Sequence, residues 1–156
     1  MQVVGIAVRA NKRAPMQEIE ETDIDPQSGL IGDFRSKIAK PDRKITVLFM
    51  SQWQEVCQQI GVELPWCTRR ANICLDEERA GPHLVGKRIY LSGELPDMIG
   101  ALLEITGETE PCVRMDEAHA GLREVIASGW RGGVTCRVLR GGSIFVGTQA
   151  TICDPK

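Results

Sequence analysis

The stretch EITGETEPCVRMD, residues 104–116, ends an apolar run and begins the loop around which the other predicted elements are arranged. The run stops at a turn that contains Gly107, and Pro111 then fixes the backbone just before Cys112. This order of residues predicts a thiol presented beyond a strand end rather than on a packed face. Cys112 is therefore the candidate functional residue. The alternative is a buried, inert cysteine, which is the commoner state of a free thiol.

The charges beside Cys112 are mixed. A reactive thiol needs exposure and a nearby positive charge, because the thiolate is the reactive form. Arg114 supplies one such charge, whereas Glu108 and Glu110 oppose it. The local sequence alone leaves both the active and the inert interpretation open.

Most of the segments on either side are typical of β-strands. Residues 45–50 are almost continuously apolar, which predicts a central strand buried on both faces. Gly141 and Gly142 separate the last two β-branched runs, which predicts a hairpin. The other predicted strands are residues 1–9, 16–24, 84–92, 99–106, 134–139 and 143–147, with a break at residues 94–97.

Two segments predict short α-helices. In residues 51–60, Ser51 and Gln54 have the spacing of a capping box, and Cys57 falls on the apolar, core-facing side. Residues 117–128 form the second predicted helix, with Asp116 as its cap. The chain is therefore predicted to be mostly β, as a partly closed barrel with two short α-helices.

An arginine pair lies between a proline-containing loop and a short apolar strand. Arg69 and Arg70 can face one pocket only if they lie in the loop, since adjacent strand residues point to opposite faces. Guanidinium groups bind phosphate through two parallel hydrogen bonds, so the pair predicts an anion clamp. A solvated, charged turn is the alternative.

The composition is that of one ordinary globular domain. The 156 residues are 42% hydrophobic and 26% charged, and we expect a single domain over residues 1–156. A formal net charge of -2 gives no electrostatic support for nucleic-acid binding. No apolar run approaches the ~18 residues of a membrane span, and the first residues do not resemble a leader, so we expect a cytoplasmic protein that does not bind a membrane. With six cysteines, two histidines and no CxxC motif, we expect reduced thiols and no structural zinc site.

Five segments together resemble the MOSC domain, named from the C-terminal part of molybdenum cofactor sulfurases, in its short stand-alone bacterial form. They occur in the family's order and with comparable spacing. The segments are GLIGD (29–33), RKITVLFMSQW (43–53), LPWCTRRANICL (64–75), LEITGETEPCVRMDEAHAGL (103–122) and WRGGVTCRVLRGGSIFVG (130–147).

The resemblance implies a β-barrel-like fold and a link to the molybdenum cofactor (molybdopterin), a pterin dithiolene that carries a phosphate. The family's characteristic cysteine falls on Cys112, which is implied as a thiolate ligand of molybdenum or as the carrier of a persulfide. The family's arginine-containing contact region falls on Arg69, Arg70 and Asn72, which are implied as phosphate or pterin partners. Arg43 is a further candidate.

Two departures from the family limit these implications. Family chains commonly close with Gly-Asp near the last strand, whereas this chain has Gly147-Thr148. The cysteine desulfurase portion of the fused sulfurases has no counterpart here, so no pyridoxal phosphate site is expected. A persulfide would have to come from a separate cysteine desulfurase, and electrons would have to come from an external redox partner.

Three hypotheses follow. The first is a molybdenum-cofactor-binding protein, an oxidoreductase for N-hydroxylated compounds, with Cys112 as catalytic residue and metal ligand. The second is a sulfur carrier that bears a persulfide on Cys112 without holding metal. The third is a binding module without chemistry, favoured if Cys112 lies buried among apolar neighbours or if the arginines pair outward into solvent.

Overall fold

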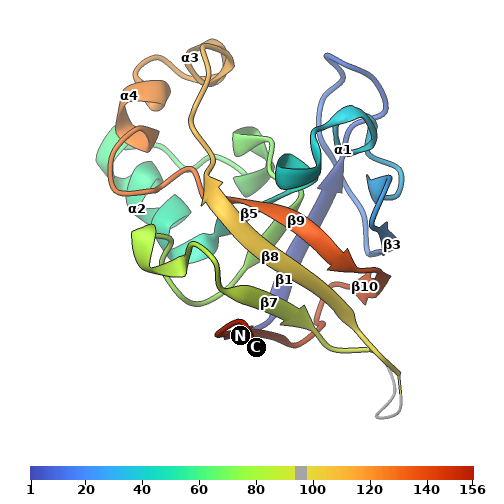
Figure 1. The fold of residues 1–156 in the computed structure, drawn as a ribbon. Helices are drawn as coiled ribbons and strands as arrows, with labels where there is room; N and C mark the ends of the chain where they lie inside the picture. Colours follow the sequence, from blue (N-terminus) through green and yellow to red (C-terminus); the bar gives the residue numbers. More distant parts are fainter. Residues whose placement is uncertain (94–97) are drawn as a thin grey trace.

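The computed structural model describes residues 1–93 and 98–156, and the predicted break at 94–97 lies outside them (Figure 1). A curled eight-stranded sheet forms the body of the protein, in the order β11-β7-β8-β9-β5-β6-β1-β2. Its strands are β1 (Val3–Val8), β2 (Gln17–Glu18), β5 (Ile45–Phe49), β6 (Ile73–Leu75), β7 (Arg88–Leu91), β8 (Ala101–Glu108), β9 (Val134–Arg140) and β11 (Ala150–Cys153). A second sheet has the order β10-β3-β4, with β3 at Glu21–Asp25, β4 at Gly29–Leu30 and β10 at Gly142–Phe145.

Backbone hydrogen bonds near the two chain ends help to close the curled sheet. Gln2 and Gln149 form an antiparallel bridge, and the amide of Val3 donates to the carbonyl of Thr148 at 2.9 Å. The beginning of β1 thus lies beside the residues that lead into β11, and the two termini lie together in Figure 1. The predicted mostly β, barrel-like fold is confirmed.

The predicted hairpin at Gly141 and Gly142 is wrong. β9 pairs with β8 and β5, whereas β10 pairs with β3 in the second sheet. A side chain at Gly141 would clash with the carbonyl oxygen of Ile24 on β3. The glycines therefore let the chain leave the first sheet and pack closely against β3 of the second sheet, instead of forming a tight turn between β9 and β10. The predicted strand at residues 16–24 is likewise divided between β2 and β3.

Two apolar clusters stabilise the fold on opposite faces of the sheet. On β5, Val47 and Phe49 belong to the cluster inside the curled sheet, and Leu48 belongs to the cluster beneath the helices. This alternation is the two-residue period of a strand buried on both faces. The predicted central strand is confirmed, since β5 lies between β9 and β6.

The described residues contain four short α-helices, where two were predicted: α1 (Phe34–Ile38), α2 (Met50–Ile60), α3 (Arg114–Ala118) and α4 (Leu122–Ile126). In Figure 1, α2, α3 and α4 gather on one side of the sheet, and each contributes buried residues to the second apolar cluster. The predicted helix at 117–128 is broken between α3 and α4, because His119 is extended and Gly121 has a φ of 85°. Within the described ranges, no helix has the length and apolar character needed to cross a membrane.

The predicted capping box is absent, since Phe49 rather than Ser51 caps α2 and makes no side-chain capping bond. Asp33 caps α1, where its carboxylate accepts from the amide of Ser36 at 2.7 Å. The same carboxylate accepts from the amide of Arg9 at 2.9 Å, so it also fixes the end of β1.

Candidate functional site

A cavity of about 220 Å³ brings all five predicted site residues together. It lies where the loop after β8 meets the 3-10 helix Trp66–Arg69 and the chain on either side of α1 and β5. Seven basic side chains line the cavity against two carboxylates, Glu108 and Glu110. The basic side chains are Arg9, Arg35, Arg43, Lys44, Arg69, Arg70 and Arg114. Such a surplus of positive charge in one cavity favours an anionic guest.

Cys112 is exposed in the loop between β8 and α3 and lines this cavity. Among the described lining residues it carries the only thiol. A Cys112 thiolate would lie close enough to Arg69 and Arg70 to interact with their charges. Burial lowers the pKa of both arginines and has the larger effect, whereas the negative charge of Cys112 raises it. Cys112 is therefore neither sealed among apolar side chains nor remote from the arginines. The features that would favour a binding module without chemistry are not found at this thiol.

The other cysteines have different surroundings. Burial raises the pKa of Cys74 to about 12 and raises the pKa of Cys136 further. Burial and the charge of Glu18 also raise the pKa of Cys67. These three thiols are held in the protonated, unreactive form at neutral pH.

Arg69 is buried, with 5% of its surface exposed, and its guanidinium holds two loops together. Its Nε donates to the carbonyl of Gly132 at 3.2 Å, and its Nη2 donates to the carbonyls of Thr109 at 3.1 Å and Glu110 at 3.4 Å. Burial lowers its pKa to about 10, so it remains a cation at neutral pH. Arg69 therefore positions the loop that carries Cys112.

Gly132 is required for this arrangement. A side chain at this position would clash with the carbonyl oxygen of Thr109 and would also press on the guanidinium of Arg69. The glycine allows the two loops to approach each other around the arginine.

Arg70 and Arg9 each have one buried side-chain nitrogen, Nε, that finds no hydrogen-bond acceptor among the described residues. Arg70 has a left-handed backbone, with a φ of 66°. Its Nη2 donates to the carbonyl of Ala14 at 2.8 Å, but its buried Nε has no hydrogen-bond partner among the described residues. The buried Nε of Arg9 also lacks one, although the Asp33 carboxylate lies 3.9 Å away. An unsatisfied buried donor is costly, so these two nitrogens on charged groups lower the stability of the fold at this cavity.

The cations also repel one another. Burial lowers the pKa of Arg9, and the charge of Arg70 lowers it further. Burial lowers the pKa of Arg70 as well, followed by the charge of Arg114. The three guanidinium groups are thus assembled at a cost that a bound anion would relieve.

Asn72 and Arg43 line the cavity in different ways. The side-chain oxygen of Asn72, Oδ1, accepts from the backbone amide of Thr46 at 3.2 Å, and its Nδ2 donates to the backbone carbonyl of Ala7 at 3.4 Å. The Asn72 side chain therefore links β1 to β5 at the wall of the cavity. Arg43 is exposed at the end of the 3-10 helix Pro41–Arg43.

The sequence pattern did not single out Arg9 or Arg35 for this cavity. Arg9 follows an apolar strand, and Arg35 lies just beyond the GLIGD segment. A single arginine in such a position is usually exposed to solvent. Only the closure of the sheet brings them beside residues more than sixty positions away along the chain. Thr148, which replaces the family's common aspartate, does not line the cavity, and its hydroxyl accepts from the amide of Phe145 at 2.9 Å.

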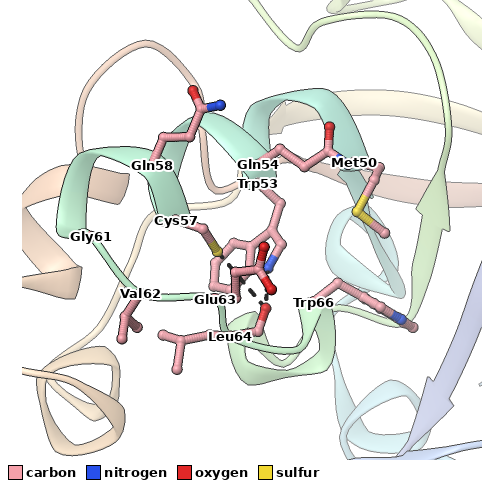
Figure 2. Close-up of a pocket in the computed structure, with 10 residues that line it drawn as sticks. All are labelled: Met50, Trp53, Gln54, Cys57, Gln58, Gly61, Val62, Glu63, Leu64 and Trp66. Atoms are coloured by element: carbon pink, nitrogen blue, oxygen red, sulfur yellow. Dashed lines mark hydrogen bonds between the residues drawn. The ribbon is translucent and has the colours of Figure 1, made fainter.

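A larger cavity, of about 590 Å³, lies beside α2 (Figure 2). Its walls include Trp53, Trp66 and the half-buried Cys57, which was predicted to lie in the core. Glu63 is its one charged lining residue, so it carries no positive charge. Within residues 1–93 and 98–156, no group of three or more His, Cys, Asp or Glu side chains could hold a metal ion.

The fold and the first cavity define a class: a small, mostly β domain that presents a cysteine beside a basic, anion-accepting cavity. The MOSC domain family matches residues 35–151, and the chain belongs to that family, which is associated with binding of the molybdenum cofactor.

Solved structures share the fold. The YuaD protein of Bacillus subtilis is 19% identical, with a TM-score of 0.72 over 99% of this chain and 96% of that chain. YiiM of Geobacillus stearothermophilus is 18% identical, with a TM-score of 0.76 over 98% and 75%. YiiM of Escherichia coli is 13% identical, with a TM-score of 0.70 over 100% and 71%. At these identities the likeness shows the fold alone. No curated protein matches the sequence significantly.

Proposed function

We propose that this protein binds the phosphorylated pterin form of the molybdenum cofactor in the cavity beside Cys112, with the Cys112 thiolate as a ligand of the metal. One observation carries the proposal: an exposed thiol shares a cavity with two buried guanidinium nitrogens, Arg9 Nε and Arg70 Nε, that lack acceptors among the described residues. A thiolate is a soft ligand, and a guanidinium is suited to a phosphate. The residues of the cavity therefore fit both ends of the cofactor.

The cavity residues divide into two roles. Arg70 and Arg9 offer donors to the phosphate, while Arg114 adds charge from the first residue of α3. Arg69 is a positioning residue, because its donors are used on the backbone of the loops at 109–110 and 132. Arg43 is placed to contact the guest at the exposed rim, and Asn72 is placed to hold the wall behind it.

When bound, the cofactor would supply two-electron redox chemistry. The reaction we propose is reduction of an N-hydroxylated compound: the N–O bond breaks, an N–H bond forms and water leaves, with two electrons from an external protein donor and two protons from solvent. This chain's own contribution is to bind the phosphate, hold the thiolate and keep the loop in place.

Metal and pterin content test this proposal. The full chain is purified anaerobically from cells that make the cofactor, and molybdenum is measured by mass spectrometry alongside the pterin released by oxidation. We expect wild type to contain both, Cys112→Ser to lose most of the metal, and Arg70→Gln to lose most of the pterin. Metal-free wild type, or unchanged metal in Cys112→Ser, would contradict the proposal.

A sulfur carrier is the second candidate, and the exposure of Cys112 favours it, because a partner protein must reach the thiol. In this case the Cys112 thiolate attacks the terminal sulfur of a persulfide on a cysteine desulfurase. A new sulfur–sulfur bond forms on Cys112, and the donor's cysteine leaves as its thiolate. Intact-protein mass after incubation with a desulfurase and cysteine should show one added sulfur that Cys112→Ser lacks; an adduct that persists in that variant would reject the carrier role.

A further inference from the structure

A second basic cavity, of about 280 Å³, adjoins the Cys112 cavity. Five cations line it and no carboxylate does: Arg9, Lys12, Arg13, Arg35 and Arg114. Arg9, Arg35 and Arg114 line both cavities, so the two lie on either side of the same three side chains. The positive surface therefore continues beyond the site proposed for the cofactor phosphate.

Three of the five cations of this second cavity have no ion-pair partner among the described residues, whereas Arg9 lies 3.9 Å from Asp33 and Arg114 lies 3.9 Å from Glu117. Among the described residues, no carboxylate forms an ion pair with Lys12, Arg13 or Arg35. The pKa of Arg9 is lowered by burial and then by the charge of Arg70, with Arg35 and Arg114 adding to the repulsion. In a chain whose formal net charge is -2, five cations around one cavity, three of them without an ion-pair partner among the described residues, favour a polyanionic guest.

Apolar surface lies beside these cations. Phe34 is half-buried and Ile38 is 58% exposed, and both line the second cavity. An aromatic ring with adjacent guanidinium groups is a surface on which a flat base can stack. A single inorganic phosphate would leave this part of the cavity unused.

We propose that the two cavities together bind a pyrophosphate-bearing nucleotide, with one phosphate on Arg9 and Arg70 and the second phosphate and base in the cavity of Lys12, Arg13 and Phe34. This inference rests on the proposed phosphate site in the Cys112 cavity and extends it. The nucleotide is either a free ligand or a part attached to the cofactor, and both sources share this chemistry.

Calorimetric titration of the full chain tests the inference, using protein from cells that cannot make the cofactor. Inorganic phosphate and guanosine diphosphate are titrated separately into wild type and into the Lys12→Gln/Arg13→Gln double variant. We expect guanosine diphosphate to bind wild type at least about tenfold more tightly than phosphate, because additional charge-assisted hydrogen bonds form. The double variant should lose most of this advantage and keep its phosphate affinity, since both replaced side chains are exposed and line only the second cavity.

Phosphate binding that depends on Arg70, without tighter binding of guanosine diphosphate, would overturn the nucleotide inference and leave the proposed function standing. Absence of phosphate binding to wild type would overturn both. An equal loss of affinity for both probes in the double variant would also contradict separate phosphate sites.

A second arm distinguishes the two sources of nucleotide. Cofactor-loaded protein is extracted with acid, and the released small molecules are identified by mass spectrometry. A nucleoside monophosphate released in proportion to pterin would show that the nucleotide is attached to the cofactor. Binding of guanosine diphosphate without such release would show a free nucleotide ligand.

Discussion

The cavity beside Cys57 and the cavity beside Cys112 differ more in charge and hydrogen bonding than their volumes suggest. The Cys57 cavity measures about 590 Å³ and the Cys112 cavity about 220 Å³. The larger one has tryptophan walls and one carboxylate, and its thiol lies 3.8 Å from the carbonyl oxygen of Leu64 (Figure 2). The smaller one has an exposed thiol, seven basic side chains and two buried donors without described acceptors.

This difference in lining residues indicates which of these cavities is the better candidate for chemistry. In the Cys57 cavity, the Trp53 indole nitrogen donates to the carbonyl of Leu64 at 2.9 Å, and the Trp66 indole nitrogen donates to Glu18 at 2.7 Å. Its buried aromatic donors are thus satisfied by the fold. In the Cys112 cavity, two buried donors have no acceptor among the described residues, so the fold holds these arginines there at a cost in stability.

The largest expected effect is the loss of Arg69. Arg69→Met removes the donors to the carbonyls at 109, 110 and 132, and we expect the unfolding free energy to fall by about 3 kcal/mol, because one buried and two partly buried carbonyls lose a charged partner. Urea unfolding measures the change. Gln58→Met in the Cys57 cavity is the control and should change stability by less than about 0.5 kcal/mol, since Gln58 is exposed. Equal, small changes in the two variants would contradict the positioning role.

The next effect is on anion affinity. Arg70→Gln should weaken binding of inorganic phosphate about tenfold or more, because a charge-assisted donor is removed. Calorimetry on the cofactor-free chain measures the affinity. Gln54→Ala in the Cys57 cavity should leave it unchanged. Similar phosphate affinities for Arg70→Gln and wild type would place the anion elsewhere.

The two thiols should also differ in alkylation rate. In a Cys153→Ser background, which removes the other exposed cysteine, Cys112 should react with iodoacetate at least about tenfold faster than Cys57. Two features favour Cys112: its thiol is exposed, and the basic cavity beside it attracts the reagent, which is an anion. Peptide mass spectrometry over a time course gives both rates, and equal rates would remove the contrast between the cavities.

The smallest effect is a pH dependence. Burial, followed by the charge of Glu110, raises the pKa of Glu108 in the Cys112 cavity. As pH falls through this raised value, which lies above the ordinary 4.5, Glu108 becomes neutral while the arginines stay charged. Sulfate, which does not titrate in this range, should therefore bind about threefold more tightly at the lower pH.

Glu108→Gln should bind sulfate more tightly than wild type at neutral pH and lose much of the pH dependence. Glu63→Gln in the Cys57 cavity is the matched control and should retain the wild-type dependence. A dependence that persists fully in Glu108→Gln would assign the titration to another group. Glu110 is the nearest candidate, since it lines the same cavity.

The sequence predicted the barrel-like fold and the exposed Cys112 loop because their signals are local. β5 is a continuous apolar run, and a proline directly precedes the thiol. Whether Arg69 and Arg70 face one cavity was left open by the sequence, which allowed it only if both lie outside a strand; the structure has both lining the Cys112 cavity. Their separate roles could not be predicted, because they depend on the carbonyls at 109, 110 and 132 for Arg69 and on the left-handed backbone of Arg70.

Long-range partners account for what the sequence could not predict. Arg9 joins the Cys112 cavity only after β1 pairs with β6, and nothing around Arg9 in the chain indicates this. The glycines at 141 and 142 resemble a hairpin turn locally, but the available partner for β10 is β3, far earlier in the chain. The Cys57 cavity was missed for the same reason, since α2 alone shows Cys57 on an apolar face.

The most direct test is the molybdenum content of wild type, Cys112→Ser and Cys57→Ser, purified in parallel and anaerobically from cells that make the cofactor. With Cys112 as the metal ligand, we predict equal molybdenum content in wild type and Cys57→Ser, and little molybdenum in Cys112→Ser. Metal retained by Cys112→Ser, or lost from Cys57→Ser while that variant remains folded, would contradict the assignment of the site to the smaller, basic cavity.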